Sequence, residues 1–177
     1  MTAVTEAIAA RFSTRGYTEE KLTAEELETL ITAALQAPTA ANRQEVHFTV
    51  LSGDNPVLAE IEAEKNRLAG LEAAPAHNFY YEAPTVFILS GDENNAWSGL
   101  DAGIATTNIT LAAESLGLGT LIIGCIKGAM LGEKRPEFSA KLQLPEGYDF
   151  KIAIAVGHKA TTKEPHTYDA DKLVTRL

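Results

Sequence analysis

Cysteine is almost absent from the chain, and long apolar runs are absent altogether. Cys125 is the single cysteine, so neither a disulfide within the chain nor a cysteine-rich metal site can form. The longest apolar runs, such as TLIIGCI, are too short to span a bilayer. The opening stretch MTAVTEAIAARF lacks the basic and apolar regions of a signal peptide. We therefore expect a globular protein that works in the cytoplasm without a membrane partner.

Positive charge is also in short supply. The chain has 15 Lys and Arg against 24 Asp and Glu, so its formal net charge is −9 at pH 7. Such a chain repels the phosphates of nucleic acids and of anionic lipids, and we expect neither as a partner. A local basic pocket for a single phosphate remains compatible with this overall charge.

Several catalytic and metal-binding patterns are missing. The four histidines are scattered without metal-ligand spacing, so no metal site is expected: His47, His77, His158 and His166. Neither a G-x-G-x-x-G fingerprint after a predicted strand nor a G-x-S-x-G elbow occurs. Cys125 falls in an apolar segment that we expect to be a strand, where a cysteine is usually an inert small hydrophobe.

Apolar periodicity and turn residues predict helices that alternate with apolar strands. Helices are expected at 2–12, from a capping box at Thr23 and Glu26 to Pro38, from Asn55-Pro56 to Gly70, at 99–116 and at 136–143. Strands are expected at 46–52, 84–91, 119–126 and 149–158, the second buried on both faces. The length suits one domain, 1–177, in which 158–177 form an extended arm. The alternation favours an α/β or α+β fold with a central sheet, but it does not fix the strand order.

The stretch 99–116 is unusual for its small residues. Its sequence, DAGIATTNITLAAESLG from Asp101 to Gly117, is dominated by Ala, Gly, Thr, Ile and Leu, so a helix here would be apolar on nearly all sides. Such a helix is expected to be buried between layers or between subunits. Gly117 is expected to end it.

The stretch RFSTRGY could bind a phosphate. Arg11, Ser13 and Arg15 follow a predicted helix, and guanidinium forks and a hydroxyl suit phosphate oxygens. The alternative is an ordinary solvated basic helix end. Both interpretations remain open from this segment alone.

Two further stretches could contact a ligand. In PTAANRQ, the amides of Asn42 and Gln44 could read the edge of a heterocycle, or the stretch is simply a polar turn. In GLGTLIIGC, Gly124 would let another group approach the backbone closely, or it marks a bulge or a packing point in a strand.

Taken in order, five segments are more specific than any one alone. They are RFSTRGY, LQAPTAANRQEVHFTV, YEAPTVFILS, DAGIATTNITLAAESLGLGTLIIGCI and LPEGYDFKIAIAVGHK. In their order and spacing the chain resembles the nitroreductase family of FMN-dependent oxidoreductases, over nearly its whole length. The resemblance implies an α+β fold with a central, mostly antiparallel sheet flanked by helices, a buried central helix, and a homodimer whose two chains share each flavin.

The resemblance also implies which residues bind FMN. Arg11, Ser13 and Arg15 match the family's phosphate-binding cluster. Asn42 and Gln44 match positions that hydrogen-bond the flavin and its ribityl chain, and the backbone around Gly124 matches the strand end beside the reactive flavin nitrogen. The full implied set is Arg11, Phe12, Ser13, Arg15, Pro38, Thr39, Ala40, Asn42, Gln44, Ile122, Ile123, Gly124, Cys125, Lys163 and His166.

The chain departs from the family pattern in places. Members often have Pro-Trp after the glutamine, whereas this chain has Glu45-Val46, which changes the contacts near that loop. Phe12 stands where many members have a second basic residue. The family's late basic pair is weak here, and Lys163 and His166 are its nearest counterparts.

The implied function is that of a homodimeric FMN-dependent oxidoreductase. It would reduce nitroaromatic or quinone-like acceptors with NAD(P)H by ping-pong hydride transfer, and Tyr80, Tyr81 and Trp97 in the shortened segment 72–98 could contact substrate. Because the cofactor carries the redox chemistry, no catalytic acid or base is assigned. Two alternatives stay open: a flavin-binding storage or electron-transfer protein with little turnover, and a specialised relative that modifies the flavin or removes halogen from its substrate.

Overall fold

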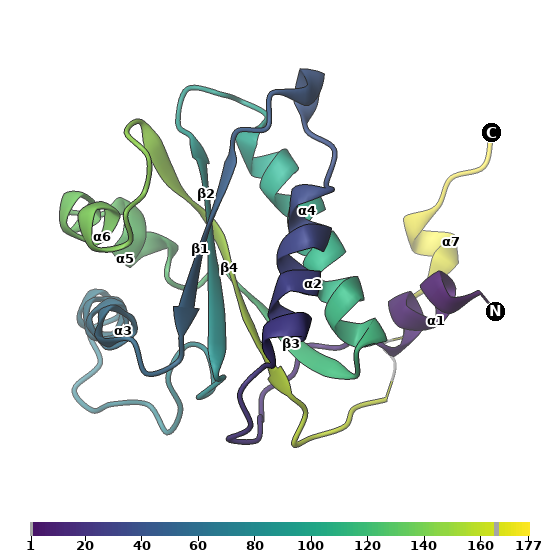
Figure 1. The fold of residues 1–177 in the computed structure, drawn as a ribbon, viewed down its shortest axis with the longest axis horizontal. Helices are drawn as coiled ribbons and strands as arrows, with labels where there is room; N and C mark the ends of the chain where they lie inside the picture. Colours follow the sequence, from purple (N-terminus) through teal and green to yellow (C-terminus); the bar gives the residue numbers. More distant parts are fainter. Residues whose placement is uncertain (1, 165–166) are drawn as a thin grey trace.

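A four-stranded sheet lies between two layers of helices in the computed structural model, which describes residues 2–164 and 167–177 (Figure 1). The strands are β1 (Val46–Ser52), β2 (Thr85–Asp92), β3 (Leu118–Ile123) and β4 (Tyr148–His158). Their order is β1-β2-β4-β3, and every neighbouring pair is antiparallel. This gives the strand order that the sequence left open, and it confirms the α+β fold.

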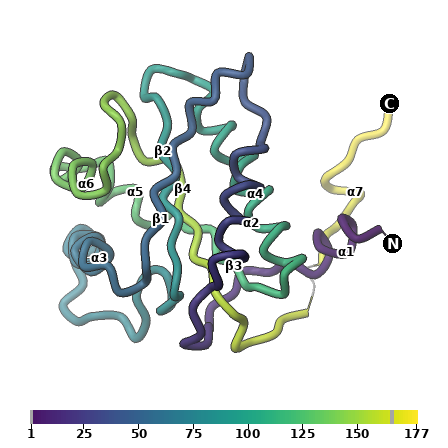
Figure 2. Tube along the Cα trace, in the orientation of Figure 1, coloured from purple at the N-terminus to yellow at the C-terminus, as the bar shows by residue number. Residues whose placement is uncertain are grey.

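The helices cover both faces of the sheet (Figure 1). One face carries α2 (Ala24–Leu35) and α4 (Ser98–Ser115), and the other carries α3 (Pro56–Leu68), α5 (Lys127–Leu131) and α6 (Arg135–Lys141). The N-terminal α1 (Ala3–Ala10) packs against α4. Figure 2 shows that the C-terminal segment with the short α7 (Ala170–Leu173) lies on the same side of the molecule as α1, so the two chain ends share one side.

The central strand β2 supplies a separate hydrophobic core on each of its faces. Residues Thr85–Gly91 are all buried, which confirms the burial expected from their near-continuous apolar run. Successive side chains of a strand point to opposite faces. Val86 and Ile88 therefore join the core with α3, α5 and α6, whereas Phe87 and Leu89 join the core with α2 and α4. Because helices cover both faces of the sheet, the edges of the sheet and the ends of its strands are the places where a ligand could reach it.

Two predicted helix starts are confirmed by their hydrogen bonds. The Glu26 carboxylate accepts from the Thr23 N–H at 2.7 Å, and the Thr23 hydroxyl accepts from the Glu26 N–H at 3.2 Å, which completes the capping box of α2. At the start of α3, the Asn55 side chain accepts from the Val57 N–H at 3.1 Å, and Pro56 takes the first helical position.

The helix of small residues, α4, is buried on one side. The side that faces the sheet and α2 is closed, as predicted, and Ala102, Ala105 and Ile109 are at most 1% exposed. On the outer side Gly103 and Thr107 are exposed in the single chain. The helix ends where predicted, at Gly117, whose φ of 77° is readily adopted by glycine. The outer side is thus free to pack against something else.

Two short helices were outside the sequence expectations. α5 and α7 span only five and four residues, so neither is long enough to show a helical period. α7 also interrupts the segment 158–177 that the sequence predicts as an extended arm. Over residues 2–164 and 167–177, no helix has the length and apolarity to cross a membrane, and no group of three His, Cys, Asp or Glu could hold a metal ion.

A buried carboxylate ties α3 to the turn before α6. Glu64 is 2% exposed, and its oxygens accept from the Arg67 guanidinium at 2.7 and 2.8 Å, with Lys134 Nζ at 3.5 Å. The Arg67 hydrogen bonds, aided by Lys134, lower the pKa of Glu64 to about 2. Because this pKa is lowered on folding, the resulting stabilisation is present above the unfolded pKa and is lost as the pH falls through the folded pKa.

We expect the free energy of unfolding to fall as the pH drops from 4.5 to about 2, partly because Glu64 must take up a proton. Glu64→Gln should lack this part of the pH dependence. The control Glu72→Gln, at an exposed position outside the cluster, should keep it. Urea unfolding at a series of pH values measures the effect. Identical pH profiles for the wild type and Glu64→Gln would contradict the assignment.

Candidate functional site

The segment Arg11–Arg15 runs beside the edge strand β3. Ser13 forms an isolated parallel bridge with Thr120, and the Thr14 N–H donates to the Thr120 carbonyl at 2.9 Å. The Tyr17 hydroxyl donates to the Thr14 carbonyl at 3.1 Å. Burial raises the pKa of Tyr17, and the Arg15 charge opposes this only in part, so the hydroxyl keeps the proton that it donates. These bonds fix the backbone of the segment.

Arg11 and Arg15 carry charges that no carboxylate neutralises. Among the described residues, no Asp or Glu oxygen lies within 4.0 Å of either guanidinium, whereas Arg43 and Arg67 each pair with a glutamate. Arg15 makes a long contact of 3.5 Å to the Ser13 carbonyl, and its guanidinium carbon lies 5.9 Å from the centre of the Tyr81 ring. Two available guanidinium groups beside a serine hydroxyl suit a phosphate.

The end of β3 differs from its prediction. The strand stops at Ile123, so Gly124 and Cys125 lie in the turn before α5, and the Cys125 thiol is exposed. The expectation that Cys125 lies in a strand is therefore wrong, because the chain leaves the sheet to form α5. Ile122 is 43% exposed. A Cβ at Gly124 would meet only Ile152 Cδ1, at 3.8 Å, so packing within the chain does not demand glycine there.

The loop Pro38–Gln44 has a strained backbone. Ala41, Asn42 and Gln44 have φ angles of 51°, 54° and 56°, in a region that residues with a side chain seldom adopt. Such conformations cost roughly 1 kcal/mol or more each, and they persist only where surrounding contacts impose them. Strain of this kind gathers at functional sites, which makes the loop a candidate ligand contact.

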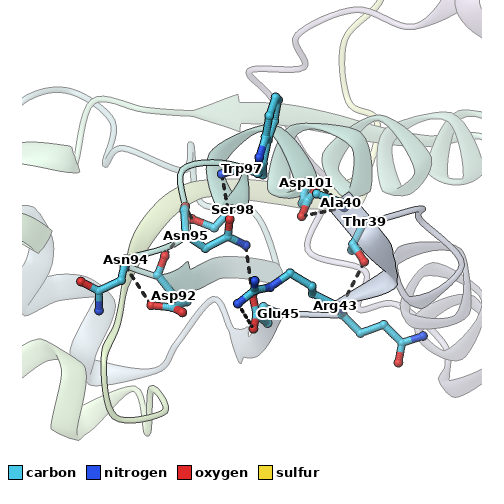
Figure 3. Close-up of polar contacts among 11 residues, drawn as sticks. Thr39, Ala40, Arg43, Glu45, Asp92, Asn94, Asn95, Trp97, Ser98 and Asp101 are labelled. Carbon is cyan, nitrogen blue, oxygen red and sulfur yellow. Dashed lines mark hydrogen bonds and ion pairs between the residues drawn. The ribbon is translucent and has the colours of Figure 1, made fainter.

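One contact holds this loop against the start of α4, and a second closes the loop on itself (Figure 3). The carboxylate of Asp101, 2% exposed, accepts from the Ala40 N–H at 3.1 and 3.2 Å. The Thr39 hydroxyl accepts from the Gln44 N–H at 2.9 Å. The Asn42 and Gln44 side chains stay exposed, with Gln44 Nε2 donating to Asn42 Oδ1 at 3.3 Å. A cavity of about 280 Å³ adjoins the loop between α2, α4 and β1.

The two groups lie at opposite corners of the sheet. Through the paired strands, Ser13 lies level with Ser52 at the far end of β1, whereas the loop enters β1 at Val46. Ser13 lies one spacing outside β3, so it is four strand spacings from β1, about 19 Å, and six residues of strand span about 20 Å. Within one chain the two groups are therefore about 28 Å apart.

The aromatic candidates fall in different environments. Tyr81 faces Arg15 and belongs with the first group. Trp97 is 58% exposed and directly precedes α4, on the side of the loop (Figure 3). Tyr80 is 8% exposed, packs in the core with α3, and donates its hydroxyl proton to the Gly53 carbonyl at 2.9 Å. The Tyr80 side chain is thus largely enclosed within the chain, unlike Tyr81 and Trp97, and its contact with substrate stays a prediction.

The remaining candidate cofactor-binding residues have fewer contacts that fix their position. The Phe12 ring lies 5.5 Å from Lys159 Nζ, which also bonds the Glu114 carboxylate at 2.6 Å. Lys163 is exposed on the segment after β4. His166 lies outside the described residues.

Sequence reasoning missed the residues that brace the loop. The sequence marks Glu45 only as a departure from the family pattern, yet its carboxylate accepts from both Arg43 and Asn95 (Figure 3). The Arg43 hydrogen bonds lower the pKa of Glu45. The bond from Asn95 spans 50 residues of sequence, and no periodic pattern reveals such a contact. The departure at Glu45 is the one signal that could have found it.

Comparison with known proteins decides the family. The family model described as Nitroreductase family matches residues 8–158, most of the chain. The chain belongs to the nitroreductase family. This confirms the resemblance on which the expected fold rests.

Solved nitroreductases share the fold closely. The chain is 34% identical to a nitroreductase with bound FMN from Desulfitobacterium hafniense DCB-2, with a TM-score of 0.88, covering 100% of this chain and 99% of that one. A nitroreductase with bound FMN from Bacteroides fragilis NCTC 9343 is 26% identical, with a TM-score of 0.88 and 100% of both chains covered.

Curated relatives are similar but longer. An FMN reductase (NAD(P)H) of Bacillus subtilis (strain 168) is 32% identical over 174 residues, which cover 86% of this chain and 65% of the relative. An FMN reductase (NADPH) of the same strain is 28% identical over 165 residues, covering 84% of this chain and 62% of the relative. The chain thus spans somewhat less than two thirds of the length of these two relatives.

Proposed function

We propose that this chain is an FMN-dependent oxidoreductase that uses NAD(P)H to reduce electron-poor acceptors of the nitroaromatic or quinone kind. The observation that carries the proposal is the pair of guanidinium groups, Arg11 and Arg15, without a carboxylate partner in the described part of an acidic chain. Membership of the nitroreductase family and the FMN-bound relatives support FMN as the phosphate-bearing ligand. The names of the two Bacillus relatives support NAD(P)H as reductant.

The residues present fit such a cofactor. Arg11, Ser13 and Arg15 offer charged and neutral donors to a phosphate. Asn42 and Gln44 expose amides that can both donate and accept, which matches the mixed polar edge of a flavin ring. The exposed turn after β3 begins at Gly124, which has no side chain of its own to keep a flat ring from the main chain, and among the described residues Ile152 Cδ1 is the one atom within 4 Å of the Cβ position.

The residues of the chain would act by binding and orienting. Bound FMN would supply the redox chemistry, accepting hydride from a reduced nicotinamide and passing it to an acceptor. Arg11 and Arg15 would anchor the phosphate, and Asn42 and Gln44 would fix the orientation of the ring. No side chain is assigned as acid or base, and Tyr81 and Trp97 are the candidates for contact with the acceptor.

We further propose that the active unit is a homodimer in which each flavin contacts two chains. The separation of about 28 Å between the two groups supports this, because a second copy could bring the loop of one chain to the arginines of the other. Large exposed apolar residues on the outer helices support it too, since exposed apolar patches mark interaction surfaces. They are Val4 and Ile8 of α1, Leu35 of α2 and Leu100 of α4, exposed by 54% to 67%.

Three finer assignments complete the proposal. Residues 1–177 form one nitroreductase-like domain, with 158–177 as its arm. Lys163 and His166 are candidates to reach the phosphate. The proposed location is the cytoplasm, where a single exposed thiol such as Cys125 stays reduced.

Changing Arg15 to Ala should weaken FMN binding about 10- to 100-fold, because a hydrogen bond between charged groups contributes about 1.5–3 kcal/mol. Binding of riboflavin, which lacks the phosphate, should hardly change. The control Arg135→Ala removes a guanidinium that pairs with Glu93 elsewhere, and it should leave both affinities unchanged. Flavin fluorescence titration measures all of these. Equal losses for FMN and riboflavin, or an unchanged FMN affinity, would count against the phosphate site.

Rapid mixing of the flavin-loaded protein with NADH or NADPH tests the activity itself. The visible flavin absorbance should bleach and should return when a quinone or a nitroaromatic compound is added, because both substrates react in turn at one site. Absorbance that stays constant with both nicotinamides would contradict the oxidoreductase proposal, and it would favour storage or electron transfer. Loss of the flavin itself during turnover, or release of halide from a halogenated substrate, would favour the specialised relative.

A further inference from the structure

Three side chains form a polar brace between the loop Pro38–Gln44 and the turn that leads into α4 (Figure 3). The Arg43 guanidinium donates to the Glu45 carboxylate twice, at 2.7 and 3.0 Å. Asn95 Nδ2 donates to the same carboxylate at 3.0 Å, while Asn95 Oδ1 accepts from the Trp97 N–H at 3.0 Å. The amide of Asn95 is thus oriented by the backbone of the turn before it reaches Glu45.

The turn that receives the brace is itself firmly held. Ser98, 1% exposed, donates its hydroxyl proton to the carbonyls of Asp92 and Asn95, each at 2.9 Å. The Asp92 carboxylate accepts from the Asn94 N–H at 2.8 Å. Glu45 therefore connects the loop to a rigid part of the fold.

The residues of the brace lie next to the strained residues in the sequence. Arg43 stands between Asn42 and Gln44, both of which have positive φ, and Glu45 directly follows Gln44. The other side of the loop is held by the Ala40 N–H on Asp101. An isolated ion pair on a surface contributes little to stability. Here Arg43 donates two hydrogen bonds to Glu45, and Asn95 donates a third from a turn that is itself held. The three bonds together restrict the backbone of the loop and connect it to the turn.

We propose that Glu45 is a positioning residue for the cofactor: through Arg43 and Asn95 it holds Asn42 and Gln44 in the left-handed conformation in which their amides meet the flavin. The proposal rests on the proposed function, because it needs this loop to contact FMN. Where many family members carry Pro-Trp, this chain uses a carboxylate and two polar partners to restrict the loop. Loosening the brace lowers the fraction of chains whose loop can bind, and the apparent affinity falls by that fraction.

Hydrogen–deuterium exchange in the flavin-free protein tests the brace without any ligand. The N–H groups of Ala40 and Gln44 are bonded to Asp101 and Thr39, so their exchange reports opening of the loop. Glu45→Ala should speed their exchange about three- to tenfold. Glu45→Gln should fall between it and the wild type, because it keeps an acceptor for Asn95 but loses the charge that holds Arg43. The control Glu60→Ala, which removes a partner of Lys141 on the other face of the sheet, should leave the loop unchanged.

Flavin titration of the same variants tests the positioning role. Glu45→Ala should weaken FMN and riboflavin equally, by about three- to tenfold, because the brace acts on contacts to the ring and not to the phosphate. Asn95→Ala, which keeps Arg43 on Glu45, should show a smaller loss in both experiments. Equal losses of the two flavins separate this effect from that of Arg15→Ala.

Each outcome has a distinct meaning. Exchange that is unchanged in Glu45→Ala overturns the brace. Faster exchange with unchanged affinity for both flavins overturns the positioning role, while leaving FMN binding as such intact. A wild-type protein that takes up no flavin overturns the proposed function, and the positioning role with it, whereas the exchange measurement still decides whether Glu45 holds the loop.

Discussion

The antiparallel register of the sheet is the constraint on which the rest of the structure depends. The strand order leaves β1 and β3 as the two edges, three strand spacings apart, and the two helix layers bury β2 on both faces. The segment of Ser13 joins the edge at β3, and the loop Pro38–Gln44 enters the other edge from the opposite end. The guanidinium groups and the strained amides are thereby kept at opposite corners of one chain, which supports the proposal that a ligand using both lies between two copies.

Each corner carries a feature that a ligand would complement. Arg11 and Arg15 hold positive charge that no described carboxylate balances, and the loop holds three residues with positive φ. The chain compensates for the loop with buried Asp101 on one side and with Glu45 on the other. Asp101 sits in the first turn of α4, where the helix dipole favours a carboxylate, so the same helix that fills one core also holds the loop.

Local signals in the sequence predict much of this fold. The capping box at Thr23 and Glu26, the strand at 46–52, the two-sided burial of β2 and the end of α4 at Gly117 are all confirmed, because each depends on neighbouring residues. Strand order does not follow from local pattern, since the alternation of helices and strands fits several topologies. The same limit applies to Tyr80 and Cys125, whose burial and exposure depend on the core with α3 and on the short helix α5.

The candidate site, like the fold, is predicted from the sequence only in part. The polar stretches around Arg11–Arg15 and Pro38–Gln44 stand out in the sequence, because charged and amide groups are dense there. Their supports do not stand out: the bond from Ala40 to Asp101 spans 61 residues, and that from Asn95 to Glu45 spans 50. Such contacts arise only when the sheet is assembled, which is why the sequence identifies the groups and the structure shows how each is held.

The central claim is that one flavin is held by the arginine group of one chain and by the loop of another. Heterodimers of an Arg15→Ala chain and a Gln44→Ala chain, purified through two different tags, test it most directly by their FMN content. If sites are shared, one site of each heterodimer combines both lesions and the other is intact, so FMN binding should return to one of the two sites although each variant alone binds weakly. Heterodimers that bind FMN no better than either variant alone would contradict the claim.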